Sequence, residues 1–203
     1  RGVDSAGVQR AQPGNPEIGP FYVEGAEPGD TLVVHLLRLE TNRTTGWSAS
    51  LLAPYTADPA FLRYEASREA KTATWQIDKQ KGIAYMDPSM DPGAFKGPRI
   101  ELPLRPMLGC IGTAPAAKAA IPTSTPDNFG GNMDYNGMGA GATVMLPVFE
   151  AGALLFLGDG HARQGDGEVL GSAIETSLDV EFSVDIVKRK KINWPRLENQ
   201  DFI

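Results

Sequence analysis

Cysteine and histidine are scarce in this chain. Its 203 residues include one cysteine, Cys110, and two histidines, His35 and His161. A lone cysteine excludes an intrachain disulfide and a thiolate zinc cage, and it fits a reducing compartment. Two histidines exclude a metal cage of three or more imidazoles. Imidazole combined with carboxylates is a ligand set that these counts leave open.

An excess of positive charge and long apolar runs are lacking as well. The formal net charge is -6, which disfavours nucleic acid or an anionic membrane as a main partner. No apolar stretch reaches the roughly 20 residues of a transmembrane helix. We therefore expect a cytoplasmic protein. Since the chain opens abruptly at Arg1, a preceding segment with an export signal is the alternative.

Glycine and proline, in contrast, are plentiful, with 23 and 16 residues. Many turns and few long helices should result, and a hydrophobic content of 41% argues against disorder. The composition predicts a mainly β (β-rich α+β) fold, barrel- or sandwich-like, with long glycine-rich loops and few short helices. We expect an extended N-terminal arm (1–17), a single domain (18–192) and an irregular C-terminal tail (193–203).

Apolar runs bounded by turn residues predict the strands. Strands are expected at 21–23, 31–39, 75–78, 82–86, 99–104, 144–149, 153–157 and 178–187. Asp58-Pro59 favours a short helix over residues 59–70, with Asp58 as its N-cap. The small residues at 109–112 indicate a turn-rich segment, and Cys110 among apolar neighbours is expected to be a buried hydrophobe.

The densest chemistry lies at residues 158–168. Asp159 and His161 are two residues apart, as are Asp166 and Glu168, and this spacing puts both members of each pair on one face of an extended segment. Such residues suit a divalent metal, or paired carboxylates can divide general acid and base work. The simpler alternative is an acidic turn, calcium-like or metal-free. Density and spacing together favour a functional site.

A second candidate region is the long loop at 123–141. Loops of this length in compact domains are usually functional or disordered. We expect the loop to lie over the site with Asp134 pointing into it; the alternative is that Asp134 caps its own backbone. His35 lies inside an apolar strand and is expected to be satisfied by a hydrogen bond rather than to act as a ligand.

Several of these segments together resemble the acetamidase/formamidase family. The most specific is Gly158-Asp159-Gly160-His161-Ala162, followed by residues 164–168 and 174–176. Further matching pieces are residues 19–30, 109–115, 130–134, 146–149 and 152–154. The resemblance implies hydrolysis of short-chain amides to ammonia and a carboxylic acid, on a β-rich fold. Residues 50–70 fit the family pattern poorly.

For such a reaction we expect a divalent metal, zinc with calcium as the alternative, held by Asp159, His161 and Asp166. The metal would activate water and polarise the amide carbonyl. A metal-free version would keep the same acids and lose only the Lewis acid.

The remaining site residues are expected to handle protons and substrate. Glu168 would be the general base and would later return the proton to nitrogen. Asp134 and Glu175 would act with it as catalytic residues that orient water or the amide NH2. Asn132 and Gln164 would bind the substrate.

Two other functions are kept beside the amidase. One is a non-catalytic metal or small-ligand binding module on the same scaffold, lacking N-terminal site residues. The other is a structural subunit that works beside another chain. The expected partners are a small amide and further copies of the chain in a homo-oligomer, with no nucleic acid and no membrane.

Overall fold

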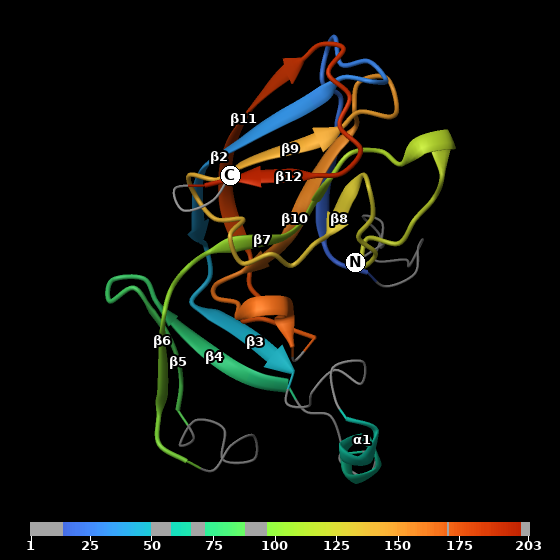
Figure 1. Ribbon diagram of the computed structural model, residues 1–203. Coiled ribbons are helices and arrows are strands. Elements are labelled where there is room, and N and C mark those ends of the chain that lie inside the picture. Colours follow the sequence, from blue (N-terminus) through green and yellow to red (C-terminus); the bar gives the residue numbers. More distant parts are fainter. Residues whose placement is uncertain (1–13, 50–57, 66–71, 88–96, 170, 200–203) are drawn as a thin grey trace, which may run out of the picture. The chain divides into compact units, whose positions relative to one another are not determined.

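The computed structural model describes residues 14–49, 58–65, 72–87, 97–169 and 171–199 (Figure 1). The chain divides into two compact units. Unit 1 comprises Arg1–Leu39, Leu108–Asp159 and Val180–Ile203, and unit 2 comprises Glu40–Met107 and Gly160–Asp179. No helix in the described residues is long and apolar enough to cross a membrane. The single domain expected over residues 18–192 stays a prediction beside this division.

Unit 1 is built mainly from eight strands among the described residues. They are β1 (Glu17–Phe21), β2 (Thr31–Thr41), β7 (Met107–Gly112), β8 (Gly130–Asn132), β9 (Thr143–Pro147), β10 (Leu155–His161), β11 (Leu178–Val187) and β12 (Arg196–Glu198). One sheet has the order β1-β10-β7-β8 and another the order β11-β2-β9-β12. Figure 1 shows β9 between β2 and β12. A 3-10 turn, η2 (Ala116–Lys118), follows β7.

The long strand β2 shows why this unit forms sheets. Its residues Leu32, Val34 and Leu36 alternate toward the core and are at most 1% exposed, as a half-buried antiparallel strand requires. β2 pairs with β9 in antiparallel register from Thr31 opposite Pro147 to His35 opposite Thr143. The expected strands at 31–39 and 178–187 are thereby confirmed.

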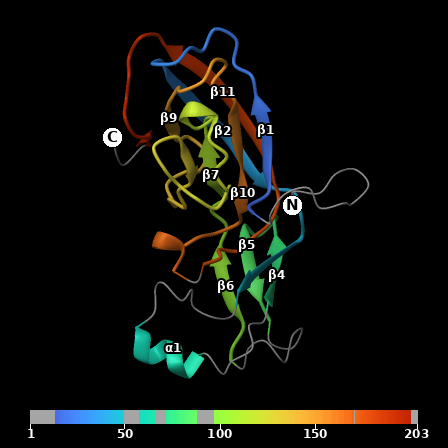
Figure 2. The same ribbon diagram turned by 90° about the vertical axis from the view of Figure 1, so that its right-hand side faces the viewer.

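Unit 2 holds the sheet β3-β4-β5-β6. Its strands are β3 (Thr45–Ala49), β4 (Thr72–Asp78), β5 (Ile83–Met86) and β6 (Ile100–Pro103); Figure 2 shows β4, β5 and β6 side by side. Trp75, Ile77 and Ala84 pack in its core together with Ala162 and Ile174. The last two residues bring the segment after β10 and residues 172–176 onto this sheet.

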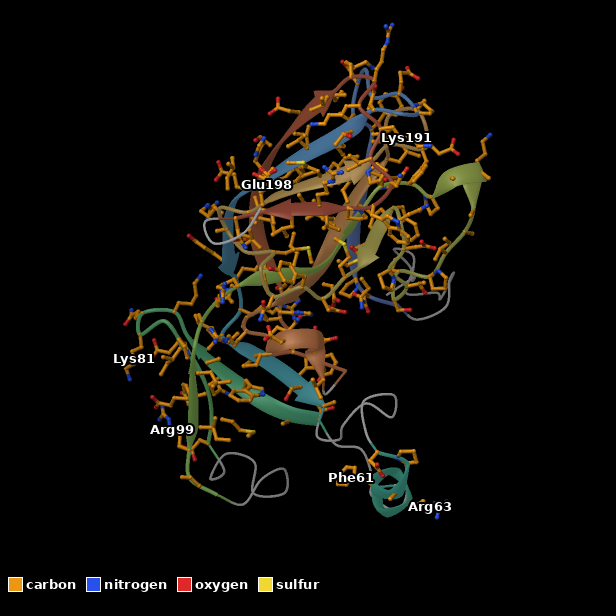
Figure 3. All side chains as sticks on the ribbon, viewed as in Figure 1. Phe61, Arg63, Lys81, Arg99, Lys191 and Glu198 are labelled. Atoms are coloured by element: carbon orange, nitrogen blue, oxygen red, sulfur yellow. The ribbon has the colours of Figure 1, made fainter. Side chains whose placement is uncertain are left out.

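The turn between β4 and β5 and the start of the helix of unit 2 lie where the sequence predicts them. Lys81, labelled in Figure 3, lies at the tip between β4 and β5, and its ammonium nitrogen is 3.7 Å from Asp78 Oδ2. The helix α1 (Pro59–Glu65) begins as predicted, with Asp58 Oδ1 accepting a hydrogen bond from the Ala60 N–H at 2.7 Å. The part of the expected helix beyond residue 65 lies outside the described residues.

The β-rich fold is confirmed, but several local predictions are wrong. Residues 109–112 are not a turn: they belong to β7, every residue of which is buried. The strand expected at 21–23 runs instead from Glu17 to Phe21. The strand expected at 153–157 begins at Leu155 and continues through His161 as β10, so Asp159 and His161 lie in the strand. The C-terminal tail contains β12, paired with β9.

Candidate active site

His161 is held by two backbone segments of unit 2 that run antiparallel. His161 lies opposite Glu175 in an isolated bridge, and Glu175 in turn lies opposite Trp47 of β3. The Ala162 N–H donates to Ile174 O at 2.8 Å, and the Thr176 N–H donates to Gly160 O at 2.9 Å. Directly opposed residues have adjacent side chains, so this pairing brings imidazole and carboxylate together.

A glycine in β3 permits this close approach. A Cβ atom at Gly46 would stand 2.8 Å from Glu175 O and 2.9 Å from a methyl of Ile174. Any side chain at this position would therefore push the Glu175 segment away from β3.

The imidazole of His161 is fully buried and has polar groups at both ring nitrogens. Its Nδ1 lies 2.9 Å from Gln164 Oε1, and an amide oxygen can only accept, so Nδ1 carries the proton in a neutral ring. Its Nε2 lies 3.3 Å from Glu175 Oε2 and 3.8 Å from Glu168 Oε1. A nitrogen lone pair facing two carboxylates is electrostatically unfavourable unless a cation or a proton lies between them.

Glu175 and Glu168 approach His161 from segments with different backbone conformations. Glu175 is fixed because its Oε1 accepts a hydrogen bond from the Ala173 N–H at 3.0 Å. Glu168 ends η3 (Asp166–Glu168), a single 3-10 turn with Gly167 at φ 68. The extended conformation expected for residues 166–168 is therefore wrong. Asp166 is exposed, whereas Glu168 has a side chain only 13% exposed.

A second polar cluster lies in unit 1 and joins three of the expected site residues. Asn15 Nδ2 donates to Asp159 Oδ2 at 2.7 Å and also to Asn132 Oδ1. Asn132 Nδ2 in turn donates to Asp134 Oδ2 at 2.6 Å. Asp159 is 9% exposed. Asn15 therefore links the 130–134 segment to the end of β10.

Glu17 and Cys110 lie beside this cluster. Burial raises the pKa of Glu17 to about 8; the neighbouring Cys110 thiol opposes the rise, and the charge of Asp159 adds to it. Burial also raises the pKa of the Cys110 thiol, and the charge of Glu17 raises it further. Cys110 is 0% exposed and its Sγ lies 3.6 Å from Thr123 O. The thiol is thus kept protonated, as expected for a buried hydrophobe rather than a nucleophile.

Three of the candidate acids hold a left-handed backbone. Asp134 has φ 45, Asp159 has φ 55 and Glu168 has φ 44. Residues other than glycine pay roughly 1 kcal/mol or more for this conformation. Ala117, Lys118, Ala153, Leu154 and Arg189 share this conformation, so the strain agrees with a role for the three acids but does not by itself assign one.

The structure thus groups most of the sequence-predicted site residues within one unit or the other. His161, Gln164, Glu168 and Glu175 form the cluster of unit 2, and Asn132, Asp134 and Asp159 form that of unit 1. Asn15 and Glu17 were missed, since they lie in a segment without periodicity that was expected to be an arm. Residues 15–17 (Asn-Pro-Glu) are polar, but they show no periodicity that would have identified them as part of a site. His35 is hydrogen-bonded as expected, to Thr143 and Asp185.

Known proteins are similar to this chain in sequence and in fold. The model of the Acetamidase/Formamidase family matches residues 16–120 and 116–201. An acetamidase of Mycolicibacterium smegmatis is 29% identical over 84% of this chain and 53% of its own length. A formamidase of Methylophilus methylotrophus is 26% identical over 84% of this chain and 51% of its own.

Solved structures agree with this match. Acetamidase from Bacillus halodurans has a TM-score of 0.75 and 34% identity, over 91% of this chain and 56% of that one. A predicted acetamidase/formamidase from Thermoanaerobacter tengcongensis has a TM-score of 0.75 and 32% identity, over 92% and 55%. The chain spans about half the length of these relatives. By the family model, which covers most of its residues, the chain belongs to the Acetamidase/Formamidase family.

Proposed function

We propose that the protein hydrolyses linear primary amides to ammonia and a carboxylic acid. Family membership supports the reaction class, since the relatives are named acetamidase and formamidase. The observation that carries the chemistry is the buried Nε2 of His161 facing Glu168 and Glu175. An amide is a poor electrophile, so the reaction requires activated water, a polarised carbonyl and a protonated leaving group.

The residues of unit 2 fit a divalent cation. One imidazole nitrogen and carboxylate oxygens form a donor set suited to zinc, manganese or iron. The hydrogen bond of Nδ1 to Gln164 Oε1 is the kind of outer contact that fixes the tautomer of a ligating histidine. When bound, such a cation would lower the pKa of a water and polarise the carbonyl. Zinc is our proposed metal, with calcium as the alternative.

Each residue then has a distinct task in this mechanism. His161 and Glu175 would hold the cation, and the Ala173 N–H keeps the Glu175 carboxylate in place. Glu168, farther from Nε2 than Glu175 is, takes a proton from the attacking water. It returns that proton to the amide nitrogen, which leaves as ammonia while the hydroxyl stays on the carbon.

The cluster of unit 1 supplies the remaining proposed roles. Asn132 and Asp134 offer a donor and acceptors that suit the amide NH2 and carbonyl. Asp159 stays a proposed ligand, as expected from its place in β10. The exposed Asp166 is left out of the ligand set, which takes Glu175 instead.

The test compares Glu168→Gln with Asp166→Asn. Both changes remove one carboxylate from the same 3-10 turn, but only Glu168 approaches His161. We expect kcat for acetamide to fall about 100-fold or more in Glu168→Gln, the usual loss of a general base. Asp166→Asn should keep near-normal kcat. Equal activity in the two variants would remove Glu168 from this role.

Metal content and chelation complete the test. Activity lost on chelation and restored by one metal would support the cation and identify it. Activity that survives chelation would leave His161 protonated between the carboxylates and the acids acting alone. Metal binding without ammonia release from any amide would favour the binding module instead. A cytoplasmic location and assembly into a homo-oligomer stay predictions from the sequence.

A further inference from the structure

The sheet of unit 2 has a core face and an opposite face, and the side chains of β3 alternate between them. Gly46 and Ser48 are buried, whereas Trp47 between them is 49% exposed. On the core face, the Ser48 hydroxyl accepts a hydrogen bond from the indole N–H of the buried Trp75 at 3.0 Å. Since successive residues of a strand point to opposite faces, the indole of Trp47 lies on the face away from this core.

The side chains of His161 and Glu175 lie on the same face as Trp47. Ala162 and Ile174, their neighbours along the chain, pack in the core of unit 2, so His161 and Glu175 point the other way. The bridges that pair Glu175 with Trp47 and with His161 agree, because directly opposed residues share one face of a sheet. The three side chains therefore form one row, with Glu175 in the middle.

The backbone fixes Trp47 close to Glu175. The Trp47 N–H donates to Glu175 O at 3.0 Å, and the Glu175 N–H donates to Trp47 O at 2.8 Å. A pair that exchanges both hydrogen bonds has its Cα atoms about 5.5 Å apart. On its other side β3 pairs with β4, with Thr74 opposite Trp47 (Figure 1). The indole is thus anchored from both sides at a set distance from the Glu175 carboxylate.

The exposure of Trp47 contrasts with that of the carboxylates in the cluster. Single exposed apolar side chains are common on protein surfaces, so exposure alone assigns no role. The side chains of Glu168 and Glu175, however, are only 13% and 14% exposed, while the indole paired with Glu175 remains half-exposed. An apolar ring system that offers a large contact area therefore stands directly beside a polar, nearly buried group of reactive side chains.

We infer that Trp47 is a substrate-binding residue whose indole packs against the acyl group of the amide. The inference rests on the proposed amide hydrolysis and narrows its substrate class. An amide whose carbonyl and nitrogen face His161 and Glu168 carries its acyl chain on the carbonyl carbon, outside the polar cluster. Formamide has a hydrogen atom in place of that chain and makes no such contact. Trp47 thus favours amides with longer acyl chains.

The size of this preference follows from the apolar contact. A fully buried methylene contributes about fourfold to binding, and one covered by the indole on a single side contributes about twofold. The three carbons of the butyramide chain should therefore contribute about eightfold to kcat/KM.

The experiment measures kcat and KM for formamide and butyramide with the wild type, Trp47→Ala, Trp47→Phe and Trp194→Ala. Trp47→Phe keeps an aromatic ring at the same position. Trp194 is 61% exposed and precedes β12 in the C-terminal tail, so Trp194→Ala is the matched control for the loss of an exposed indole.

Trp47→Ala should lower kcat/KM for butyramide about eightfold, mainly through KM, and should change that for formamide by less than about twofold. Trp47→Phe should keep most of the wild-type value for butyramide, and Trp194→Ala should alter neither amide. An equal loss for both amides in Trp47→Ala is the result of a purely structural role, and it would overturn the inference. So would unchanged kinetics in that variant.

Binding measured by tryptophan fluorescence separates this inference from the proposed function. The chain has three tryptophans, and Trp75 is buried, so in Trp194→Phe the only exposed indole is that of Trp47. Butyramide should change the emission of Trp194→Phe, and this change should vanish when Trp47→Phe is added. If no amide is hydrolysed, such a change would still support Trp47 as a binding residue and would overturn hydrolysis alone. Neither hydrolysis nor a change in emission would overturn both.

Discussion

The buried carboxyl of Glu17 should make the protein less stable as the pH rises through the neutral range. Its pKa is raised from 4.5 to about 8, chiefly because burial disfavours the charged form. Below pH 4.5 the carboxyl is protonated in the folded and the unfolded chain, and it has no effect on stability. Between these values only the unfolded chain releases the proton, so the free energy of unfolding falls with pH. Above about pH 8 the loss is complete.

The size of the loss follows from the two pKa values. A difference from 4.5 to about 8 corresponds to about 5 kcal/mol at 1.36 kcal/mol for each pH unit. Glu17 is only half-buried, and water screens part of the penalty, so we expect about 2–3 kcal/mol. Glu17→Gln keeps the shape and removes the ionisation. The free energy of unfolding of Glu17→Gln should therefore exceed that of the wild type by about 2–3 kcal/mol at pH 9 and by much less at pH 5.

Urea unfolding at a series of pH values between 4 and 9 measures the stability difference between Glu17→Gln and the wild type directly. The exposed Glu24 provides the matched control, since Glu24→Gln removes the same charge from the surface. The difference between Glu17→Gln and wild type should grow with pH, whereas that of Glu24→Gln should stay nearly constant. A pH-independent difference for Glu17→Gln would refute the reasoning, since the carboxyl would then ionise normally in the folded chain.

Two further predictions concern the segment after β11. Arg189 is exposed and has φ 56, so Arg189→Gly should relieve about 1 kcal/mol of strain and raise the Tm by about 2–3 °C in thermal unfolding; a lower Tm would contradict this. The pKa of Asp30 is lowered to about 2 by its bonds with Lys188 and the Arg189 N–H. Asp30→Asn should therefore be less stable than wild type at pH 7, and the gap in urea unfolding should close as the pH falls from 4 toward 2. A gap of constant size over that range would show that ionisation of Asp30 does not stabilise the fold.

The predictable part of the fold is the part with a regular apolar period. β11 alternates over its whole length, and β2 alternates from Leu32 to Leu36 and again, after a shift at Leu37-Arg38, from Leu39 to Thr41. Asp58-Pro59 marks the start of α1. β7 escaped prediction because Gly109, Cys110 and Gly112 resemble a turn in composition. Their small side chains are needed because this strand is buried throughout, a requirement set by neighbours far away in the sequence.

The chemistry of the site was more predictable than its geometry. The density of acids around His161 identified Glu168 and Glu175 as candidates. The approach of Glu175 to Nε2 depends on its backbone bridges to His161 and Trp47, and that of Glu168 on the 3-10 turn η3. No local pattern reveals either. The interpretation of Asp166 assumed an extended chain, whereas Gly167 turns the backbone and leaves Asp166 exposed. Glu17 owes its raised pKa to tertiary burial alone.

Backbone strain at the candidate acids offers an argument that is independent of the comparisons. Asp134, Asp159 and Glu168 lie in three separate segments, yet each holds a left-handed backbone that glycine would adopt without the steric penalty of a Cβ atom. The neighbouring Gly160 and Gly167 show that glycine is freely used in these segments. Keeping an acid where glycine would be more stable sacrifices about 1 kcal/mol at each position. Ala117, Lys118, Ala153, Leu154 and Arg189 hold the same conformation, so the strain singles out the three acids only together with their polar contacts. Asp134 and Asp159 share the Asn15-Asn132 network, and Glu168 approaches His161. The proposed amide hydrolysis gives a reason for carboxylates at these strained positions.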